Sequence, residues 1–127
     1  MTIHLDTNFL IRMRIPGGIE DHLHRSWTAA GLRLQASAIA WSEFLCGPLD
    51  ISVRRYARQL LGAPVPMEEE DADLAAELFN FSGRRRGSLP DCQIAAIAIH
   101  RGASLATANR ADFLRFTAAG LILANAS

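Results

Sequence analysis

The stretch MTIHLDTNFLIR, residues 1–12, begins with an apolar run, passes through a polar insert and continues as a helical pattern. Ile3 to Leu5 predict a short buried strand, and Asn8 to Ile15 predict a helix that ends before Pro16-Gly17-Gly18. Asp6 stands directly between the two. A strand that passes straight into a helix is typical of an α/β fold, so the first question is why this strand ends on an aspartate.

The rest of the chain repeats this alternation of short apolar runs and helical stretches. Ser37 is a candidate helix N-cap, and glycines stop several of the helical patterns. The predicted strands cover residues 3–5, 32–36, 65–67, 104–107 and 121–123, and the predicted helices cover residues 8–15, 20–30, 38–46, 49–61, 71–81, 91–101 and 110–116. This alternation favours an α/β fold with a mostly parallel central sheet and helices on both faces. No repeat or long linker divides the chain, so we expect a single domain over residues 1–127.

The composition is that of an ordinary globular domain, with 50% hydrophobic and 20% charged residues. No apolar run approaches the roughly 18 residues of a membrane span, and the first residues lack the pattern of a signal peptide. We therefore expect a cytoplasmic protein with no membrane segment. Cys46 and Cys92 do not form a disulfide framework, and both are interpreted as small buried hydrophobes.

The charges sum to zero but are segregated along the chain, and every basic residue is arginine. One basic cluster comprises Arg54, Arg55 and Arg58, and a second is the run Arg84-Arg85-Arg86. An acidic stretch, residues 68–73, lies between them. Solvated helix faces would explain such runs as well as binding would. The zero net charge argues against strong non-specific affinity for nucleic acid.

Acidic and amide side chains follow the predicted strands where those strands end. Asp6 follows the first strand, Asp91 begins a helix, and Asn109 and Asp112 follow the strand at 104–107. The carboxyl ends of parallel strands share one edge of a sheet, which is where α/β proteins place their ligands. Carboxylates brought together repel one another unless a cation lies among them, and Mg²⁺ or Mn²⁺ prefers such oxygen ligands. Such an ion can activate water and hold the oxygens of a phosphodiester.

Each of these acids also has a structural alternative. Asp6 could cap the following helix, Asp91 could interact with a helix dipole, and Asp112 could be a solvated acid. Glu43 is harder to explain in this way because its helix, residues 38–46, is nearly all apolar. A glutamate buried in such a helix needs a partner or an ion, but Glu43 lies midway along the helix and not directly after a strand.

Four segments then carry a resemblance: LDTNFLI (5–11), SAIAWSEFLCG (37–47), LPDCQIAAIAIHRGASLAT (89–107) and ANRADF (108–113). Together and in this order they resemble PIN-domain proteins over essentially the whole chain, most closely the VapC-type toxins of bacterial toxin–antitoxin operons. The resemblance implies an endoribonuclease that needs Mg²⁺ or Mn²⁺ and hydrolyses tRNA or rRNA, leaving a 5′-phosphate and a 3′-hydroxyl. It also implies a homodimer and a cognate antitoxin bound along a helical groove, for which the apolar faces of helices 20–30 and 49–61 are candidates.

Residue by residue, the resemblance implies the following roles. The acidic metal ligands and catalytic groups fall on Asp6, Glu43 and Asp91, with Asp112 as the fourth position and Asn109 as a neutral ligand or water positioner. Hydrogen-bonding support falls on Thr7, Asn8 and Thr107. The run Arg84, Arg85 and Arg86 is the candidate for RNA phosphates, with antitoxin contact or solvation as its alternatives.

Three other functions compete with this interpretation. A phosphorelay receiver domain is also a parallel α/β domain with a Mg²⁺ site, but it needs an acidic pair near the first strand and a late lysine, and this chain has no lysine. A non-catalytic PIN binding module is not favoured, because all the acidic positions are filled. A PIN nuclease for RNA maturation outside a toxin operon cannot be separated from a toxin by sequence.

Overall fold

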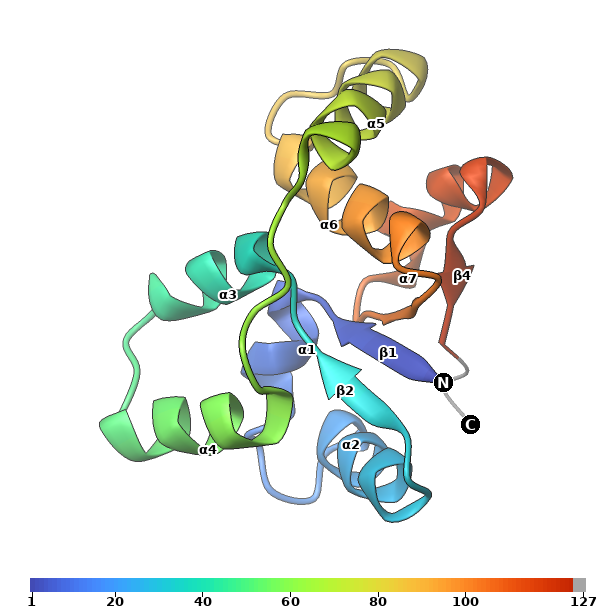
Figure 1. Ribbon diagram of the computed structural model, residues 1–127. Helices are drawn as coiled ribbons and strands as arrows, with labels where there is room; N and C mark the ends of the chain where they lie inside the picture. The colour runs from blue at the N-terminus through green and yellow to red at the C-terminus, as the bar shows by residue number, and fades with distance from the viewer. Residues whose placement is uncertain (125–127) are drawn as a thin grey trace.

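The computed structural model of the protein describes residues 1–124, and it contains one four-stranded sheet (Figure 1). The strands are β1 (Thr2–Leu5), β2 (Arg33–Gln35), β3 (Ser104–Ala106) and β4 (Ile122–Leu123). They lie in the order β2-β1-β3-β4, and every pairing is parallel. The prediction of an α/β fold with a parallel sheet is confirmed. β1 is a central strand, so the residue that follows it emerges in the middle of the sheet edge.

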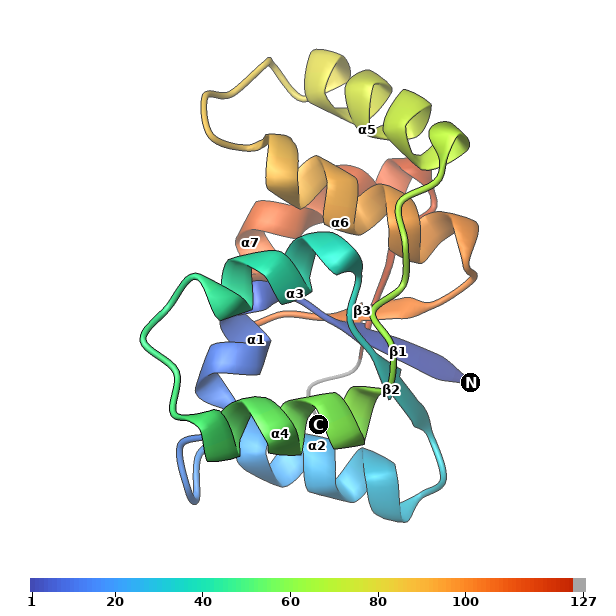
Figure 2. The same ribbon diagram turned by 60° about the vertical axis from the view of Figure 1, so that its left-hand side comes forward.

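Helices cover both faces of the sheet, as the alternating pattern predicts (Figures 1 and 2). They are α1 (Thr7–Arg12), α2 (Ile19–Ala29), α3 (Ala38–Leu45), α4 (Ile51–Leu61), α5 (Glu69–Phe81), α6 (Leu89–His100), α7 (Arg110–Phe113) and a 3₁₀ helix, η1 (Leu114–Ala119). α6 lies over one face and α2 over the other, while α5 packs outside α6. No helix within residues 1–124 has both the length and the apolarity to cross a bilayer.

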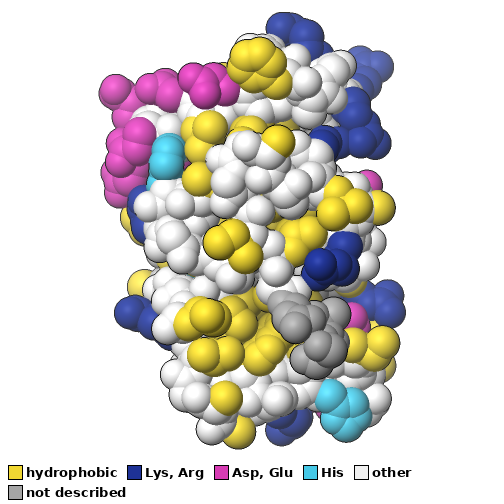
Figure 3. Space-filling model, turned by 90° about the vertical axis from the view of Figure 1, so that its right-hand side faces the viewer, with side chains coloured by type: hydrophobic (Ala, Val, Ile, Leu, Met, Phe, Trp, Pro, Cys, Tyr) yellow, Lys and Arg dark blue, Asp and Glu magenta, His cyan; other side chains and the backbone are white. Residues whose placement is uncertain are grey.

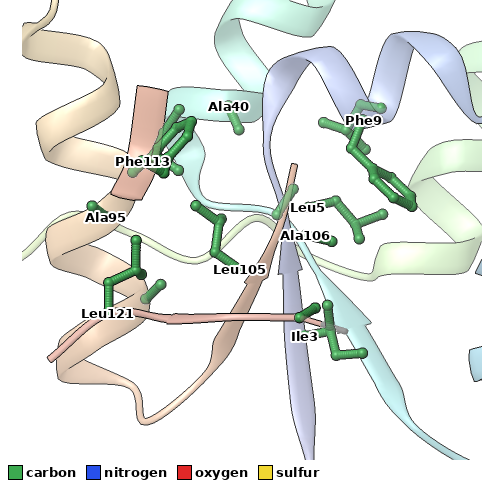
Figure 4. Packing of buried hydrophobic residues seen from close by; sticks show 14 of the residues in the cluster. Ile3, Leu5, Phe9, Ala40, Ala95, Leu105, Ala106, Phe113 and Leu121 are labelled. Atoms are coloured by element: carbon green, nitrogen blue, oxygen red, sulfur yellow. The ribbon is translucent and has the colours of Figure 1, made fainter. Parts of the chain in front are cut away.

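The hydrophobic core lies between the sheet and α6 on one side, and between the sheet, α1 and α2 on the other (Figure 4). Ile94 to Ala98 of α6 are all buried, so this helix is the central one and not a surface helix. On the sheet, Leu5 is fully buried opposite Ala106, its partner in the β1–β3 register. Burial on both faces fixes the register of β1 and β3, and thereby the positions of the residues that follow them.

Three predicted elements differ from the structure. Residues 65–67 do not form a strand: Val65 makes one parallel bridge to Ser37, and its neighbours Pro64 and Pro66 lack the N–H groups that a ladder needs. The first helix ends at Arg12 instead of Ile15. The predicted helix 110–116 is a single α turn, α7, followed by η1. The other element ends agree within about two residues, as expected for helix termini.

The two cysteines have different environments. Cys92 is fully buried in α6, as predicted. Cys46, at the end of α3, is exposed, so its interpretation as a buried hydrophobe is wrong. It stands beside Gly47, where the apolar pattern of α3 ends and the chain returns to the surface.

Candidate active site

Asp6 is buried at the carboxyl end of β1, with only 3% of its surface exposed. Its backbone N–H donates to the carbonyl of Ala106 (3.0 Å), which continues the β1–β3 ladder by one residue. Its side chain is the N-cap of α1, because Oδ1 accepts from the backbone N–H of Phe9 (2.8 Å). The second oxygen, Oδ2, accepts from the hydroxyl of Thr107 (2.5 Å). Capping therefore uses one carboxylate oxygen, and a threonine from the neighbouring strand end holds the other.

Thr107 connects Asp6 to the loop before α7. Its hydroxyl donates to Asp6 and also accepts from the backbone N–H of Asn109 (2.9 Å). Asn109 occupies the N-cap position of α7 without a side-chain cap bond, and it is exposed. Asp112 lies one turn further, partly buried, and its N–H donates to the carbonyl of Asn109 (3.0 Å). The residues that follow β1 and β3 thus form one hydrogen-bonded chain.

Glu43 is exposed on α3, so the expectation of a glutamate buried in an apolar helix is wrong. The buried face of α3 is formed by Ala40 and Phe44, and Glu43 lies on another side of the helix. Its Oε1 accepts from the hydroxyl of Thr7 (2.6 Å), the residue next to Asp6. Glu43 therefore reaches the sheet edge through the first residue of α1. Asn8, beside Thr7, is exposed, and no hydrogen bond of its side chain occurs within residues 1–124.

Asp91 lies partly buried in the first turn of α6, directly after Pro90. Burial raises its pKa, and the charges of Glu43 and Asp112 raise it further, while Arg115 and Arg85 oppose the shift. Its place in a helix first turn agrees with the dipole alternative, but these interactions also put it among the other acids.

The pKa of Asp6 is raised from 3.8 to about 6. Burial is the largest cause, and the charges of Asp91 and Glu43 add to it, while the hydrogen bonds from Thr107 and Phe9 oppose it. A carboxylate that is costly to ionise without a cation, next to other acids, is typical of functional sites.

Asp6, Glu43, Asp91 and Asp112 are near enough for their charges to affect one another, but their side chains do not surround a common point. In the part of the chain that the structure describes, no three His, Cys, Asp or Glu side chains lie close enough together to hold a metal ion. Nor does any arginine or histidine among residues 1–124 form an ion pair with Asp6, Glu43, Asp91 or Asp112. The donor set consists of carboxylates and hydroxyls without a paired cation, which is the chemistry that suits Mg²⁺ or Mn²⁺.

Arg115 is a charged residue near this site that sequence reasoning did not find. Its guanidinium lies 4.6 Å from the ring centroid of Phe116, and its buried Nε has no hydrogen-bond partner in the described residues. Its charge lowers the pKa of Asp91. The available signal was that this arginine stands between two apolar residues, Leu114 and Phe116, where burying a charge is costly unless it has a partner.

Arg84, Arg85 and Arg86 are exposed in the connection between α5 and α6. Arg84 has a positive φ of 55°, donates from Nη1 to Asn80 Oδ1 (2.8 Å), and lies 5.8 Å from the ring centroid of Phe79. Figure 3 shows basic side chains gathered beside the α5–α6 connection, and acidic side chains over the other end of α5. The run precedes Asp91 by one short loop, and Arg85 is close enough to affect its pKa.

Comparison with solved structures gives neighbours that are similar in fold over nearly the whole chain. VapBC2 from Rickettsia felis, bound to a DNA fragment from its promoter, has a TM-score of 0.77 at 21% identity, covering 98% of each chain. VapBC-1 from nontypeable Haemophilus influenzae has a TM-score of 0.74 at 22% identity, covering 99% of this chain and 98% of that one. FitAcB from Neisseria gonorrhoeae has a TM-score of 0.68 at 22% identity, with 98% and 97% covered. Comparison with curated protein sequences found no match.

The family model of the PIN domain matches residues 3–118. That span runs from β1 into η1 and includes every acidic position described above. The chain therefore belongs to the PIN-domain family.

Proposed function

We propose that this protein is a divalent-metal-dependent endoribonuclease and the toxin of a type II toxin–antitoxin pair. The observation that carries the proposal is the buried carboxyl of Asp6, held by Thr107 and Phe9, whose pKa is raised to about 6 beside Asp91 and Glu43. Such a group is costly to the fold at neutral pH unless a cation accompanies it. A cation site is the simplest reason for its presence.

The residues that would hold Mg²⁺ or Mn²⁺ are Asp6, Glu43 and Asp91, with Asp112 or Asn109 completing the set. When bound, such an ion would lower the pKa of a water molecule and neutralise charge on the phosphodiester. Hydrogen bonds within the protein orient these carboxylates. Thr107 and Phe9 fix both oxygens of Asp6, and Thr7 fixes one oxygen of Glu43, so these carboxylates are oriented before an ion arrives.

RNA would approach over the α5–α6 connection. Arg84, Arg85 and Arg86 are exposed there, immediately before the helix that carries Asp91. Arginine forks bind phosphate oxygens in pairs and carry no base information, so this run would position the backbone. The positive φ of Arg84 and its contacts with Asn80 and Phe79 give the loop a defined shape.

The toxin assignment draws on the solved neighbours, which include a toxin–antitoxin complex from Klebsiella pneumoniae and a member of the VapBC family of toxin–antitoxin systems. By this likeness we propose a cognate antitoxin as partner. The resemblance of the sequence motifs to VapC-type toxins is the ground on which we propose a homodimer as the assembly.

Cleavage of a structured RNA pool tests the proposal, using wild type, Asp6→Asn and Asp50→Asn in Mg²⁺, Mn²⁺ or EDTA. Asp50 is a matched control, because it is an aspartate N-cap on α4 whose Oδ1 accepts from Ser52 N–H (3.0 Å). We expect metal-dependent cleavage by wild type and Asp50→Asn and none by Asp6→Asn. Equal cleavage by all three would overturn the assignment of Asp6, and no cleavage by folded wild type would favour a non-catalytic PIN module.

A further inference from the structure

A hollow of about 380 Å³ lies between α5 and η1, and we call it the Phe81 hollow. Its apolar lining includes Leu74, Leu78, Phe81 and Phe116, and its charged lining consists of Glu77 and Arg115. None of the four acids of the candidate active site lines it. The hollow therefore needs a separate explanation.

Phe81, the last residue of α5, presents its ring to solvent. It is 90% exposed, whereas every other phenylalanine of the chain is buried or partly buried. Within residues 1–124 no aromatic ring stacks on Phe81 and no arginine lies over it. An aromatic ring beside a hollow and without a cover is typical of a surface that binds a partner.

The basic run 84–86 is held beside this ring by the turn that ends α5. Gly83 and Arg84 both have positive φ, of 91° and 55°, and the backbone N–H of Arg84 donates to the carbonyl of Phe79 (2.9 Å). The chain therefore folds back on the last turn of α5. Arg85 and Arg86 are exposed, and within residues 1–124 their side chains form no ion pair and donate no hydrogen bond. Their charges are available to an anion.

Arg115 connects the Phe81 hollow to the candidate active site. It lines the hollow from η1, and its buried Nε has no hydrogen-bond partner in the described residues. Its charge also lowers the pKa of Asp91, so this end of the hollow lies near the first turn of α6. A ligand in the hollow would therefore lie between the exposed ring of Phe81 and the acidic residues.

The mixture of an apolar hollow and neighbouring arginines fits a nucleotide. A base is flat and neutral and stacks on an aromatic ring, while its phosphates pair with arginine. Glu77 repels phosphate, but a carboxylate can accept from the N–H groups of a base. A second copy of the chain fits less well, because a two-fold contact centred on Phe81 would bring two copies of the basic run together.

We propose that the Phe81 hollow binds an unpaired base of the RNA substrate, with the base stacked on Phe81 and the adjoining phosphates on the basic run 84–86. This inference rests on the ribonuclease function proposed above and adds a base subsite to it. Phe81 is a positioning residue, because it holds a nucleotide beside α6 while the acids act on the phosphodiester. Stacking tolerates any base, so Phe81 contributes affinity and placement and does not select the base.

The test is a fluorescence-anisotropy titration of the full chain in EDTA, where metal-dependent cleavage does not occur, with two labelled RNAs. The first is a hexamer of adenylate, and the second is the same sugar–phosphate hexamer without bases. Both carry the same phosphates, so the difference in their affinities measures contacts with the bases. We expect wild type to bind the adenylate hexamer about fivefold or more tightly than the abasic hexamer.

Substitutions of Phe81 separate stacking from other apolar contact. Phe81→Leu keeps an apolar side chain without the ring, and it should weaken the adenylate hexamer by about fivefold or more and leave the abasic hexamer unchanged. Phe81→Tyr keeps the ring and should bind both RNAs as wild type does. The triple variant Arg84→Gln/Arg85→Gln/Arg86→Gln should weaken both RNAs alike. Ile122→Ala, at a 63% exposed position on β4, is the control and should change neither.

The inference is overturned if wild type binds the two hexamers equally, or if Phe81→Leu binds the adenylate hexamer as tightly as wild type. Unchanged RNA binding together with a change from dimer to monomer in Phe81→Leu would assign Phe81 to a contact between two copies instead. The titration needs no cleavage, so its failure differs from failure of the proposed function. Cleavage without a preference for the adenylate hexamer would remove only the base subsite, and base-dependent binding without cleavage would keep the subsite and overturn the nuclease.

Discussion

The hydroxyl of Thr107 donates to Oδ2 of Asp6 at 2.5 Å, across 101 positions of sequence. The contact is possible because β1 and β3 are paired in parallel, with Leu5 opposite Ala106, so the residues that follow each strand meet at the same edge. It answers the question raised by the first strand. Asp6 follows β1 directly, and three interactions explain that position. Its side chain caps α1, accepts a hydrogen bond from Thr107, and lies close enough to Asp91 and Glu43 for their charges to raise its pKa.

Replacing Thr107 with Val should move the pH dependence of cleavage. In wild type the hydrogen bond from Thr107 favours the ionised form of Asp6 and so lowers its pKa. Removing that bond should raise the pKa of Asp6 above its wild-type value of about 6. A hydrogen bond to a charged group is worth about 1.5–3 kcal/mol, so the acid limb of the pH–rate profile should shift upward by about one pH unit or more. Thr107→Ser, which keeps the hydroxyl, should follow wild type. An unshifted acid limb in Thr107→Val would show that this bond does not control Asp6.

Asp6→Asn should make the metal-free fold more stable at neutral pH. The folded-state pKa of Asp6 is raised, so its protonated form is favoured, and stability is lost as the pH rises from 3.8 through about 6. At pH 7 this amounts to about 3 kcal/mol. Asparagine caps helices as well as aspartate does and carries no charge. Thermal unfolding in EDTA should therefore give a Tm several degrees above wild type at pH 7, with the difference shrinking toward pH 4. A variant that is less stable than wild type at pH 7 contradicts this.

Glu43→Gln should separate activity from stability. Glu43 is exposed, and its only side-chain hydrogen bond within residues 1–124 is the 2.6 Å bond from Thr7, so the substitution should change stability by about 0.5 kcal/mol or less. Cleavage should fall by about 100-fold, because a neutral amide is a poor ligand for a hard cation. Urea unfolding and initial cleavage rates measure the two effects. Unchanged cleavage would remove Glu43 from the site.

Arg115→Met should raise the pKa of Asp91. Arg115 opposes the upward shift that burial and Glu43 produce at Asp91, and methionine keeps the packing on Phe116 without the charge. Arg115→Lys keeps the charge and is the control. A ¹³C NMR titration of the Asp91 carboxyl in the metal-free protein should show a higher midpoint only in Arg115→Met. Identical midpoints in wild type and both variants would mean that Arg115 acts only through packing.

The sheet could be predicted from sequence because its signals are local. Ile3 to Leu5 and Ser104 to Thr107 are short apolar runs bounded by turn or cap residues, and both strands lie within about one residue of the prediction. Residues 65–67 have a similar appearance, but two prolines remove the donors on both sides of Val65, which a pattern of hydrophobicity does not register.

The environment of the site was harder to predict than its residues. Glu43 was expected to be buried because the residues around it in the sequence are apolar. α3 buries only one of its sides, and Glu43 lies on another side, where it accepts a hydrogen bond from Thr7. Arg115 was missed because Asp91, whose pKa it lowers, is 24 positions away in the sequence. Burial and long-range contacts of this kind depend on tertiary packing, which a single sequence does not display.

The measurement that tests the central claim most directly is a Mn²⁺ titration of purified wild type, Asp6→Asn and Asp50→Asn, followed by the EPR signal of free Mn²⁺. The two variants remove one aspartate N-cap charge each, at α1 and at α4. The account predicts that wild type and Asp50→Asn bind Mn²⁺ alike, and that Asp6→Asn binds it about 100-fold more weakly. Mn²⁺ binding by Asp6→Asn as tight as that of wild type would contradict the account.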